Sequence, residues 1–149
     1  EDKVDLAKEL LASAGGKLML PVDNVVAAEL KEGAECRVSE TVPDGMMGLD
    51  IGPKTVEAYS KVIAGTKTII WNGPMGVFEK PPFDKGTVAL AKAVAESGAV
   101  SVVGGGDSEK AIKAAGVAGK ISHISTGGGA SLEFLTGIEL PGVAALTDK

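Results

Sequence analysis

Short apolar runs rich in Val and Ile recur along the chain, and glycines stand at the ends of most of them. Such runs are typical of strands that are covered on both faces of a parallel sheet. The run at 35–39 is more polar than the others, so we expect it at a sheet edge. The pattern predicts strands at residues 17–23, 35–39, 46–53, 67–71, 100–103 and 122–126.

The segments between most of these runs carry apolar residues at helical spacing. They predict helices at residues 2–14, 54–64, 84–97, 109–115 and 131–135. Pro53 suits the first turn of a helix, and Asp84 and either Asp107 or Ser108 suit N-cap positions. Residues 23–28 are expected to form a loop that enters a weak helical turn.

Strands that alternate with helices indicate an α/β fold with a mainly parallel sheet and right-handed crossovers. Ligands of such sheets bind at the carboxyl ends of the strands. Glycine-bearing turns follow predicted strands at 48–52, 73–76, 104–106 and 127–129, and we expect all of them along one sheet edge. The apolar tail at 140–146 is expected to pack back on the sheet.

The chain is organised around residues 100–108, where a β-branched run leads into Gly104-Gly105-Gly106 and then Asp107. A glycine turn that opens a helix directs backbone N–H groups outward, and the helix dipole favours an anion there. A carboxylate beside bound phosphates indicates Mg²⁺, which takes one or two carboxylates together with phosphate oxygens. The turn alone is equally consistent with tight strand-to-helix geometry, in which Asp107 only caps the helix.

Two further features suit a phosphate ligand. The turn Gly127-Gly128-Gly129 opens the last predicted helix, and its N–H groups suit a second anion or a phosphoryl group in transit. A tight strand-to-helix turn is the alternative. Glu79 follows a turn and suits hydrogen bonds from ribose hydroxyls, although a solvated loop carboxylate is the commoner case. Neither a Gly-x-Gly-x-x-Gly fingerprint nor a P-loop is present.

Three other residues have both structural and functional interpretations. Trp71, the only tryptophan, lies in a buried strand and is expected in the core. His123, the only histidine, is expected to be a hydrogen-bonded structural residue. Asp50 ends a strand, so a functional role and capping of the helix that starts at Pro53 are equally open.

Composition narrows the class of protein. A net charge of −5 and a pI near 4.9 give no indication of nucleic acid or an anionic membrane as partner. The single cysteine, Cys36, excludes an internal disulfide and indicates a reducing compartment, so we expect a cytoplasmic location. We find no signal peptide and no long apolar run, and expect no membrane insertion. The chain starts inside a helical pattern without Met, which indicates a fragment.

Several long and specific segments, in order along the chain, resemble phosphoglycerate kinase: Pro21–Asp23, Gly48–Pro53, Trp71–Glu79, Gly104–Ser108, Ser125–Glu133 and Leu140–Val143. That family has an N-terminal domain that binds phosphoglycerate and a C-terminal domain that binds Mg–ADP or Mg–ATP, joined by a hinge. The resemblance implies that residues 1–149 form a partial C-terminal domain with a Rossmann-like three-layer α/β/α architecture. It also implies a glycolytic phosphotransferase with a carboxyl group as acceptor.

The resemblance implies roles for individual residues as well. Adenine would contact Gly48 and Leu49, and ribose would contact Glu79. The nucleotide cleft would be lined by Asn72, Pro74, Gly76 and Val77. The phosphates would contact Gly105, Gly106 and Ser108, where many relatives have Thr, and Asp107 would hold Mg²⁺. The transferring phosphoryl group would be held, as the catalytic anion site, by Gly127, Gly128 and Gly129.

Parts of the family pattern have no counterpart in this sequence. The N-terminal domain, through which 1,3-bisphosphoglycerate and 3-phosphoglycerate would bind, is absent, and so are a Gly-Ala-Lys-type segment and a Gly-Gly segment at the nucleotide. We therefore expect a sheet that lacks one or two strands, no activity of this chain alone, and self-association through exposed edges. A nucleotide-binding module without chemistry and a folded fragment without function stay open as alternatives.

Overall fold

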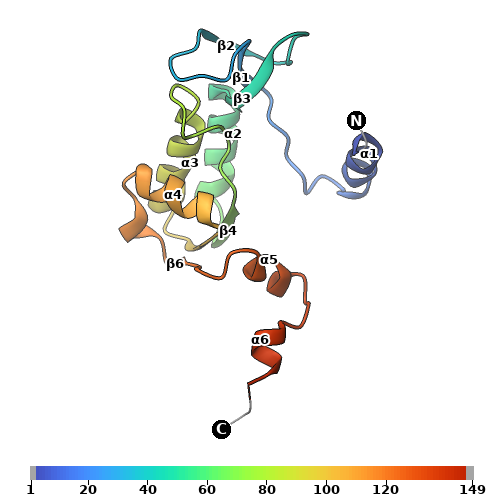
Figure 1. Cartoon of the computed structure of the whole chain (residues 1–149), viewed down its shortest axis with the longest axis vertical. Helices are drawn as coiled ribbons and strands as arrows, with labels where there is room; N and C mark the ends of the chain where they lie inside the picture. Colours follow the sequence, from blue (N-terminus) through green and yellow to red (C-terminus); the bar gives the residue numbers. More distant parts are fainter. Residues whose placement is uncertain (1–2, 147–149) are drawn as a thin grey trace.

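The computed structural model describes residues 3–146, whose strands form two three-stranded sheets (Figure 1). One sheet is antiparallel with the order β2-β1-β3, and the other is parallel with the order β4-β5-β6. The α/β class with a parallel sheet is confirmed. The strands are β1 Asn24–Ala27, β2 Cys36–Ser39, β3 Met47–Ile51, β4 Thr68–Asn72, β5 Val100–Gly104 and β6 His123–Ile124.

Every predicted helix is present. The helices are α1 Val4–Ser13, α2 Pro53–Ala64, α3 Lys85–Glu96, α4 Gly106–Ala114, α5 Gly129–Leu135 and α6 Pro141–Ala144, with a 3₁₀ turn η1 at Ala118–Lys120. The predicted start of α1 at Asp2 lies outside the described residues. Asp84 is the N-cap residue of α3, as predicted, but its side chain makes no capping hydrogen bond. No helix within residues 3–146 is long and apolar enough to span a membrane.

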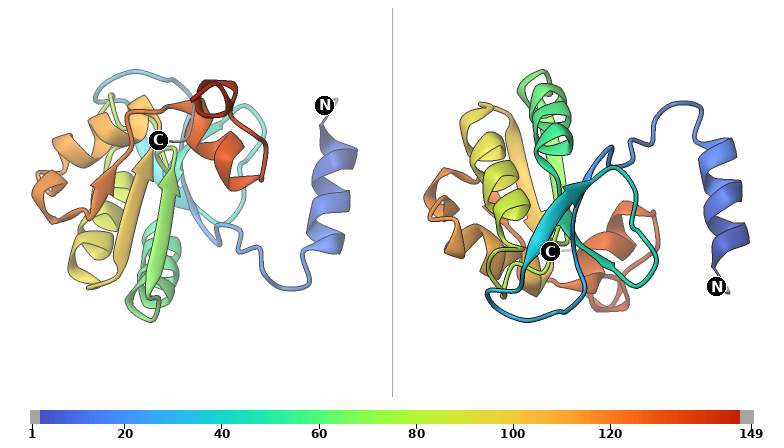
Figure 2. Two further views of the ribbon diagram at one scale, coloured as in Figure 1. Left: turned by 90° about the horizontal axis from the view of Figure 1, so that it is seen from below. Right: turned by 90° about the horizontal axis from the view of Figure 1, so that it is seen from above.

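The larger of two buried hydrophobic clusters lies between the parallel sheet and the helices α2, α3 and α4. Trp71 and Val103 are paired in register across β4 and β5, and both point toward these helices. Leu90 and Val94 of α3 and Ile112 of α4 pack against them, each less than 5% exposed. In the left view of Figure 2, α2 and α3 lie behind the strands. One face of the parallel sheet is therefore well covered.

The opposite face of the same sheet is largely open. Ile70, Val102 and His123 form the neighbouring row across β4, β5 and β6, and Ile70 is 53% exposed. Of the helices, α5 lies nearest this face, so the third layer is incomplete. His123 is exposed on this face, because side chains alternate between the two faces along β6, and its hydrogen-bonded structural role stays a prediction.

The predicted strand at 17–23 is wrong. This segment is extended and carries α1 away from the rest of the molecule (Figures 1 and 2), and α1 has no buried residue. The hydroxyl group of Tyr59 donates to the carbonyl of Met19 at 3.0 Å. No other strand pairs with 17–22 within the described part of the chain, and a strand needs such a neighbour. The strand begins instead at Asn24, where we expected a loop and a helical turn.

The apolar tail does not pack on the sheet as predicted. Leu140 lines a hollow at the open face, but Val143 and Leu146 are 60% and 73% exposed. They belong to α6 and the residues that follow it, which lie beyond α5 at the lower end of Figure 1. Because α6 is only four residues long and turns away from the strands, its apolar side chains cannot reach them.

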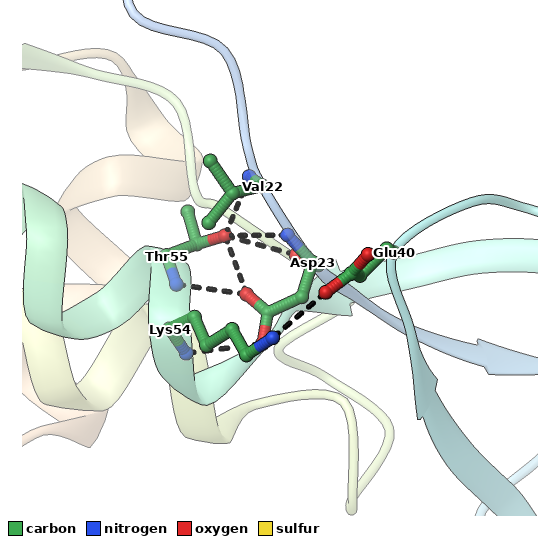
Figure 3. Close-up of polar contacts among 5 residues, drawn as sticks. All are labelled: Val22, Asp23, Glu40, Lys54 and Thr55. Atoms are coloured by element: carbon green, nitrogen blue, oxygen red, sulfur yellow. Dashed lines mark hydrogen bonds and ion pairs between the residues drawn. The ribbon is translucent and has the colours of Figure 1, made fainter.

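Asp23 fixes the start of α2 from a distance of more than thirty residues along the chain (Figure 3). One carboxylate oxygen accepts from the backbone N–H of Thr55 at 2.8 Å and from its hydroxyl at 2.6 Å, and the other accepts from the N–H of Lys54 at 3.0 Å. Asp23 is 1% exposed. Burial raises the pKa of its carboxyl group, but the hydrogen bonds from Thr55 and Lys54 outweigh burial, so the net pKa is lowered.

Candidate functional site

Glycine-bearing turns follow all strands of the parallel sheet, as predicted. The turns at 73–76, 104–106 and 127–129 come directly after β4, β5 and β6 and therefore lie along its carboxyl edge. The turn at 48–52 does not, because it lies within and after β3, which pairs antiparallel with β1 in the other sheet. That part of the prediction is wrong. The two regions still meet, because the N–H of Val77 donates to the carbonyl of Leu49 at 2.9 Å.

This meeting point encloses a hollow of about 350 Å³. Five predicted nucleotide-binding residues line it: Gly48, Leu49, Pro74, Gly76 and Val77. Pro21, Asn24, Asp50, Ile51 and Met75 complete the lining. The structure thus brings residues from β3 and from the loop after β4 to one place, although more than twenty residues separate them in sequence.

Two side chains hold the start of the loop after β4. The indole N–H of Trp71 donates to the carbonyl of Gly73 at 2.5 Å, and the N–H of Gly73 donates to the hydroxyl oxygen of Ser108 at 2.7 Å. Gly73 has a φ of +88°, a conformation that favours glycine. Trp71 is buried, as predicted for a core residue. The loop is therefore tied both to its own strand and to the first turn of α4.

The middle of the loop is fixed by α3. The hydroxyl oxygen of Thr87 accepts from the N–H groups of Met75 and Gly76 at 3.1 and 3.2 Å. A Cβ atom at Gly76 would overlap the carboxylate of Asp50 and the carbonyl of Phe83. The loop therefore lies tightly against the start of α3.

Asp50 caps α3 and not the helix that starts at Pro53. Its Oδ2 atom accepts from the N–H of Gly86 at 2.7 Å, and its Oδ1 atom accepts from the N–H of Ile51 at 2.8 Å. Asp50 is therefore a helix cap, but capping of the helix that starts at Pro53 was the wrong prediction, because Asp23 already caps that helix. Burial raises the pKa of the Asp50 carboxyl group, and these two hydrogen bonds only partly oppose it.

The first turn of α4 carries no side-chain cap. Gly105 is the N-cap with a φ of +90°, so the prediction of Asp107 or Ser108 at this position is wrong. Helix geometry leaves the N–H groups of the first turn without partners inside the helix. Asn72 lies beside this turn, because a Cβ atom at Gly105 would stand 3.2 Å from its Oδ1 atom. Within the described residues, no carboxylate caps the start of α4, whereas Asp23 caps α2 and Asp50 caps α3.

Asp107 and Ser108 have opposite environments in this turn. The side chain of Asp107 is 64% exposed and forms an ion pair with Lys110 at 3.0 Å. This hydrogen bond, and to a lesser degree the negative charge of Glu79, raise the pKa of the Lys110 ammonium group. Ser108 is only 1% exposed, and its hydroxyl oxygen accepts from Gly73. Asp107 is therefore exposed to solvent, whereas Ser108 is part of the support of the loop after β4.

The chemistry of Asp107 fits a magnesium ion that arrives with phosphates. Residues 3–146 contain no group of three or more His, Cys, Asp or Glu side chains that would hold a metal without help. Mg²⁺ keeps several waters and uses one or two carboxylates with substrate phosphates, so one exposed carboxylate at a helix start suits it.

The turn at Gly127, Gly128 and Gly129 forms a separate region. Gly128 is the N-cap of α5 with a φ of +53°. The hydroxyl groups of Ser125 and Ser131 lie 2.5 Å apart, and the N–H of Gly127 donates to Ser125 at 3.2 Å. Ser125, Gly127 and Ser131 line a different hollow of about 450 Å³ at the open sheet face. This turn shares the sheet edge with the other site residues but does not line the hollow at Leu49.

Sequence reasoning missed Thr87 and Lys110. Thr87 lies on α3, which the sequence presents only as an amphipathic helix, and no local pattern connects it with Met75 and Gly76. Lys110 follows Asp107 by three residues on α4, a spacing at which opposite charges meet on a helix. That spacing is the signal from which the ion pair was predictable.

A parallel sheet with glycine turns and a shaped hollow at its carboxyl edge defines the class of α/β proteins that bind a ligand there. A family profile described as phosphoglycerate kinase matches residues 1–138. The chain belongs to the phosphoglycerate kinase family.

The similar proteins agree with this assignment. The chain is 73% identical over 146 residues to a phosphoglycerate kinase of Solibacter usitatus, covering 98% of this chain and 37% of that protein. It is 56% identical to one of Lactobacillus delbrueckii subsp. bulgaricus, covering 100% and 38%. Among solved structures, the enzyme from Coxiella burnetii aligns with a TM-score of 0.88 at 44% identity, over 93% of this chain and 37% of that one. That from Pyrococcus horikoshii OT3 has a TM-score of 0.84 at 40% identity, over 97% and 36%. The chain thus spans little more than a third of these relatives.

Proposed function

We propose that the chain is the partial C-terminal, nucleotide-binding domain, residues 1–149, of a two-domain phosphoglycerate kinase, and that it binds Mg–ADP or Mg–ATP. The observation that carries this proposal is the hollow lined by Gly48, Leu49, Pro74, Gly76 and Val77. The loop that forms it is tied by Gly73 and Ser108 to the first turn of α4. This loop therefore links a hollow that suits a base to a helix start that suits phosphates.

Each part of the nucleotide has a proposed partner. The base lies against Gly48 and Leu49, and the nucleotide cleft is lined by Asn72, Pro74, Gly76 and Val77. Glu79, which is exposed, accepts from the ribose hydroxyls. The phosphates meet the N–H groups of Gly105, Gly106 and Ser108, because the side chain of Ser108 is buried and its hydroxyl oxygen accepts from Gly73. Asp107 is the protein ligand of Mg²⁺.

The reaction is the reversible transfer of a phosphoryl group between 1,3-bisphosphoglycerate and ADP, giving 3-phosphoglycerate and ATP. Mg²⁺ held by Asp107 would supply positive charge that offsets the charge of the phosphates. The chain holds the nucleotide in position and excludes water from the base. The N–H groups of Gly127, Gly128 and Gly129 are the catalytic anion site, which stabilises charge on the phosphoryl group in transit. Phosphoryl transfer needs little more from a protein than this positioning and charge stabilisation.

The acceptor side of the reaction belongs to the N-terminal domain, which would bind 1,3-bisphosphoglycerate and 3-phosphoglycerate. In-line transfer needs donor and acceptor about 3–3.5 Å apart, an alignment that is worth about 7–11 kcal/mol of the barrier. We therefore expect no measurable turnover of residues 1–149 alone in a coupled assay with 1,3-bisphosphoglycerate and Mg–ADP. Turnover within about tenfold of a typical kinase rate of 1–100 s⁻¹ would contradict the proposal that transfer needs the N-terminal domain.

A nucleotide-binding module without chemistry is the second candidate, and the same hollow supports it. The two differ in a full-length protein, where only the kinase converts 1,3-bisphosphoglycerate.

We also propose a cytoplasmic location, consistent with one unpaired cysteine, Cys36. The free edge of β4 and the exposed Ile70 favour self-association, which mass measurement during gel filtration tests.

A further inference from the structure

Thr87 stands directly behind the loop that forms the nucleotide hollow. It lies in the first turn of α3, is 0% exposed and is not part of the lining. Its hydroxyl oxygen accepts from two successive N–H groups, those of Met75 and Gly76, at 3.1 and 3.2 Å. Both of these residues line the hollow. One buried side chain therefore holds the middle of the loop.

The loop has little freedom to find another arrangement. Gly76 lies so close to Asp50 and to the carbonyl of Phe83 that a Cβ atom would overlap both. The N–H of the next residue, Val77, donates to the carbonyl of Leu49 at 2.9 Å, and both residues line the hollow. A shift of Met75 and Gly76 away from Thr87 therefore moves Val77 relative to Leu49. The shape of the hollow depends on the hydroxyl group of Thr87.

We propose that Thr87 is a positioning residue that sets the width of the nucleotide hollow through Met75 and Gly76 without touching the ligand. This inference rests on the proposed binding of Mg–ADP. Replacing Thr87 with the isosteric valine keeps the packing but leaves two amide donors without an acceptor. Because a buried donor without a partner is costly, the loop moves to find one. Serine keeps the acceptor and should restore the arrangement.

The experiment compares Thr87→Val and Thr87→Ser with the wild-type chain by calorimetric titration with Mg–ADP. Ser101→Ala is the matched control: Ser101 is 1% exposed, and its hydroxyl oxygen accepts from the N–H of Ser122 at 3.0 Å. Ser101 lies near the amino end of β5, opposite the carboxyl edge. We expect the dissociation constant to rise about tenfold in Thr87→Val and less than about twofold in Thr87→Ser and Ser101→Ala.

Amide hydrogen exchange gives a second readout that needs no nucleotide. In the wild-type chain, the N–H groups of Met75 and Gly76 should exchange at least about tenfold more slowly than an exposed turn amide such as Gly45. In Thr87→Val these two amides should lose protection, and in Thr87→Ser they should keep it. If Thr87→Val folds poorly, the wild-type chain and Thr87→Ser still decide the question, because protected amides of Met75 and Gly76 are expected in both.

The outcomes separate the two proposals. Weaker Mg–ADP binding and faster exchange in Thr87→Val, both restored in Thr87→Ser, support the positioning role. Unprotected Met75 and Gly76 amides in the wild type, or equal affinity in Thr87→Val and wild type, overturn it. A wild-type chain that has protected amides but does not bind Mg–ADP overturns the proposed nucleotide function, and with it the role of Thr87 in that function.

Discussion

The N-termini of α2 and α3 differ from that of α4 in what occupies them. Asp23 fills the start of α2 and Asp50 fills the start of α3, and both carboxylates are buried and come from distant strands or loops. The start of α4 has a glycine N-cap, no capping side chain and an exposed carboxylate, Asp107, that points away to Lys110. The chain thus supplies its own anion where a helix start is structural. Where none is supplied, the helix start is free for an external anion.

The largest expected effect concerns the free helix start. In a full-length kinase that carries this sequence, Asp107→Ala should lower turnover at limiting Mg²⁺ by at least about 100-fold, because one preorganised charge-stabilising group is lost. Glu109→Ala is the matched control, since Glu109 lies in the same helical turn and pairs with Lys113 instead. Its turnover should stay within about twofold of wild type. Near-normal turnover of Asp107→Ala would reduce Asp107 to a helix-dipole residue.

A filled helix start should respond in stability. Asp23→Ala removes the acceptor of three hydrogen bonds from Thr55 and Lys54 and should lower the free energy of unfolding by about 2 kcal/mol or more. Urea denaturation followed by circular dichroism measures this. Glu40→Ala serves as control, because its ion pair with Lys54 is largely exposed and screened by solvent, so that its loss should change the free energy of unfolding far less. Equal effects of the two substitutions would show that Asp23 is no cap.

The contributions of Asp23 and Asp50 to folding stability should change in opposite directions as the pH falls. These changes should be smaller than the effects described above. The pKa of Asp23 is lowered in the folded state, so its stabilisation is present above its ordinary pKa of 3.8 and is lost as the pH falls through the lowered value. The pKa of Asp50 is raised, so its protonation stabilises the fold as the pH falls toward 3.8.

Asp23→Asn and Asp50→Asn isolate these contributions when stability is measured between pH 7 and pH 2. Relative to wild type, Asp23→Asn should lose less stability on acidification below about pH 4. Asp50→Asn should lack the gain that wild type obtains above that pH. A wild-type profile that both substitutions leave unchanged would contradict the assigned pKa shifts.

The order of strands and helices was predictable because each element has a local signature. The β-branched runs at β4 and β5 and the glycines after them mark both the strands and the shared edge. The first strand was not predictable in the same way. Leu18–Leu20 and Val25–Ala27 are both apolar, and which of them pairs depends on neighbouring strands that the local sequence does not reveal.

The glycine turns and Asp107 were predictable because anion binding by backbone N–H groups and metal binding by a carboxylate can be inferred from the local sequence alone. The contacts that hold the site residues in place were not predictable. Asp50 reaches Gly86 across 36 positions, and Ser108 reaches Gly73 across 35, so that no periodicity connects them. The caps were misassigned for the same reason, since local spacing favours a nearby cap while the fold supplies a distant one.

The most direct test of the account maps the amide chemical shifts of the isotope-labelled chain during titration with Mg–ADP. We predict shifts at Gly105–Ser108, where the helix start is free, and at Leu49 and Val77 in the hollow. The amides of Lys54, Thr55 and Gly86 should stay unchanged, because Asp23 and Asp50 already occupy those helix starts. Shifts confined to the starts of α2 and α3, or no saturable shift at Gly105–Ser108, would contradict the account.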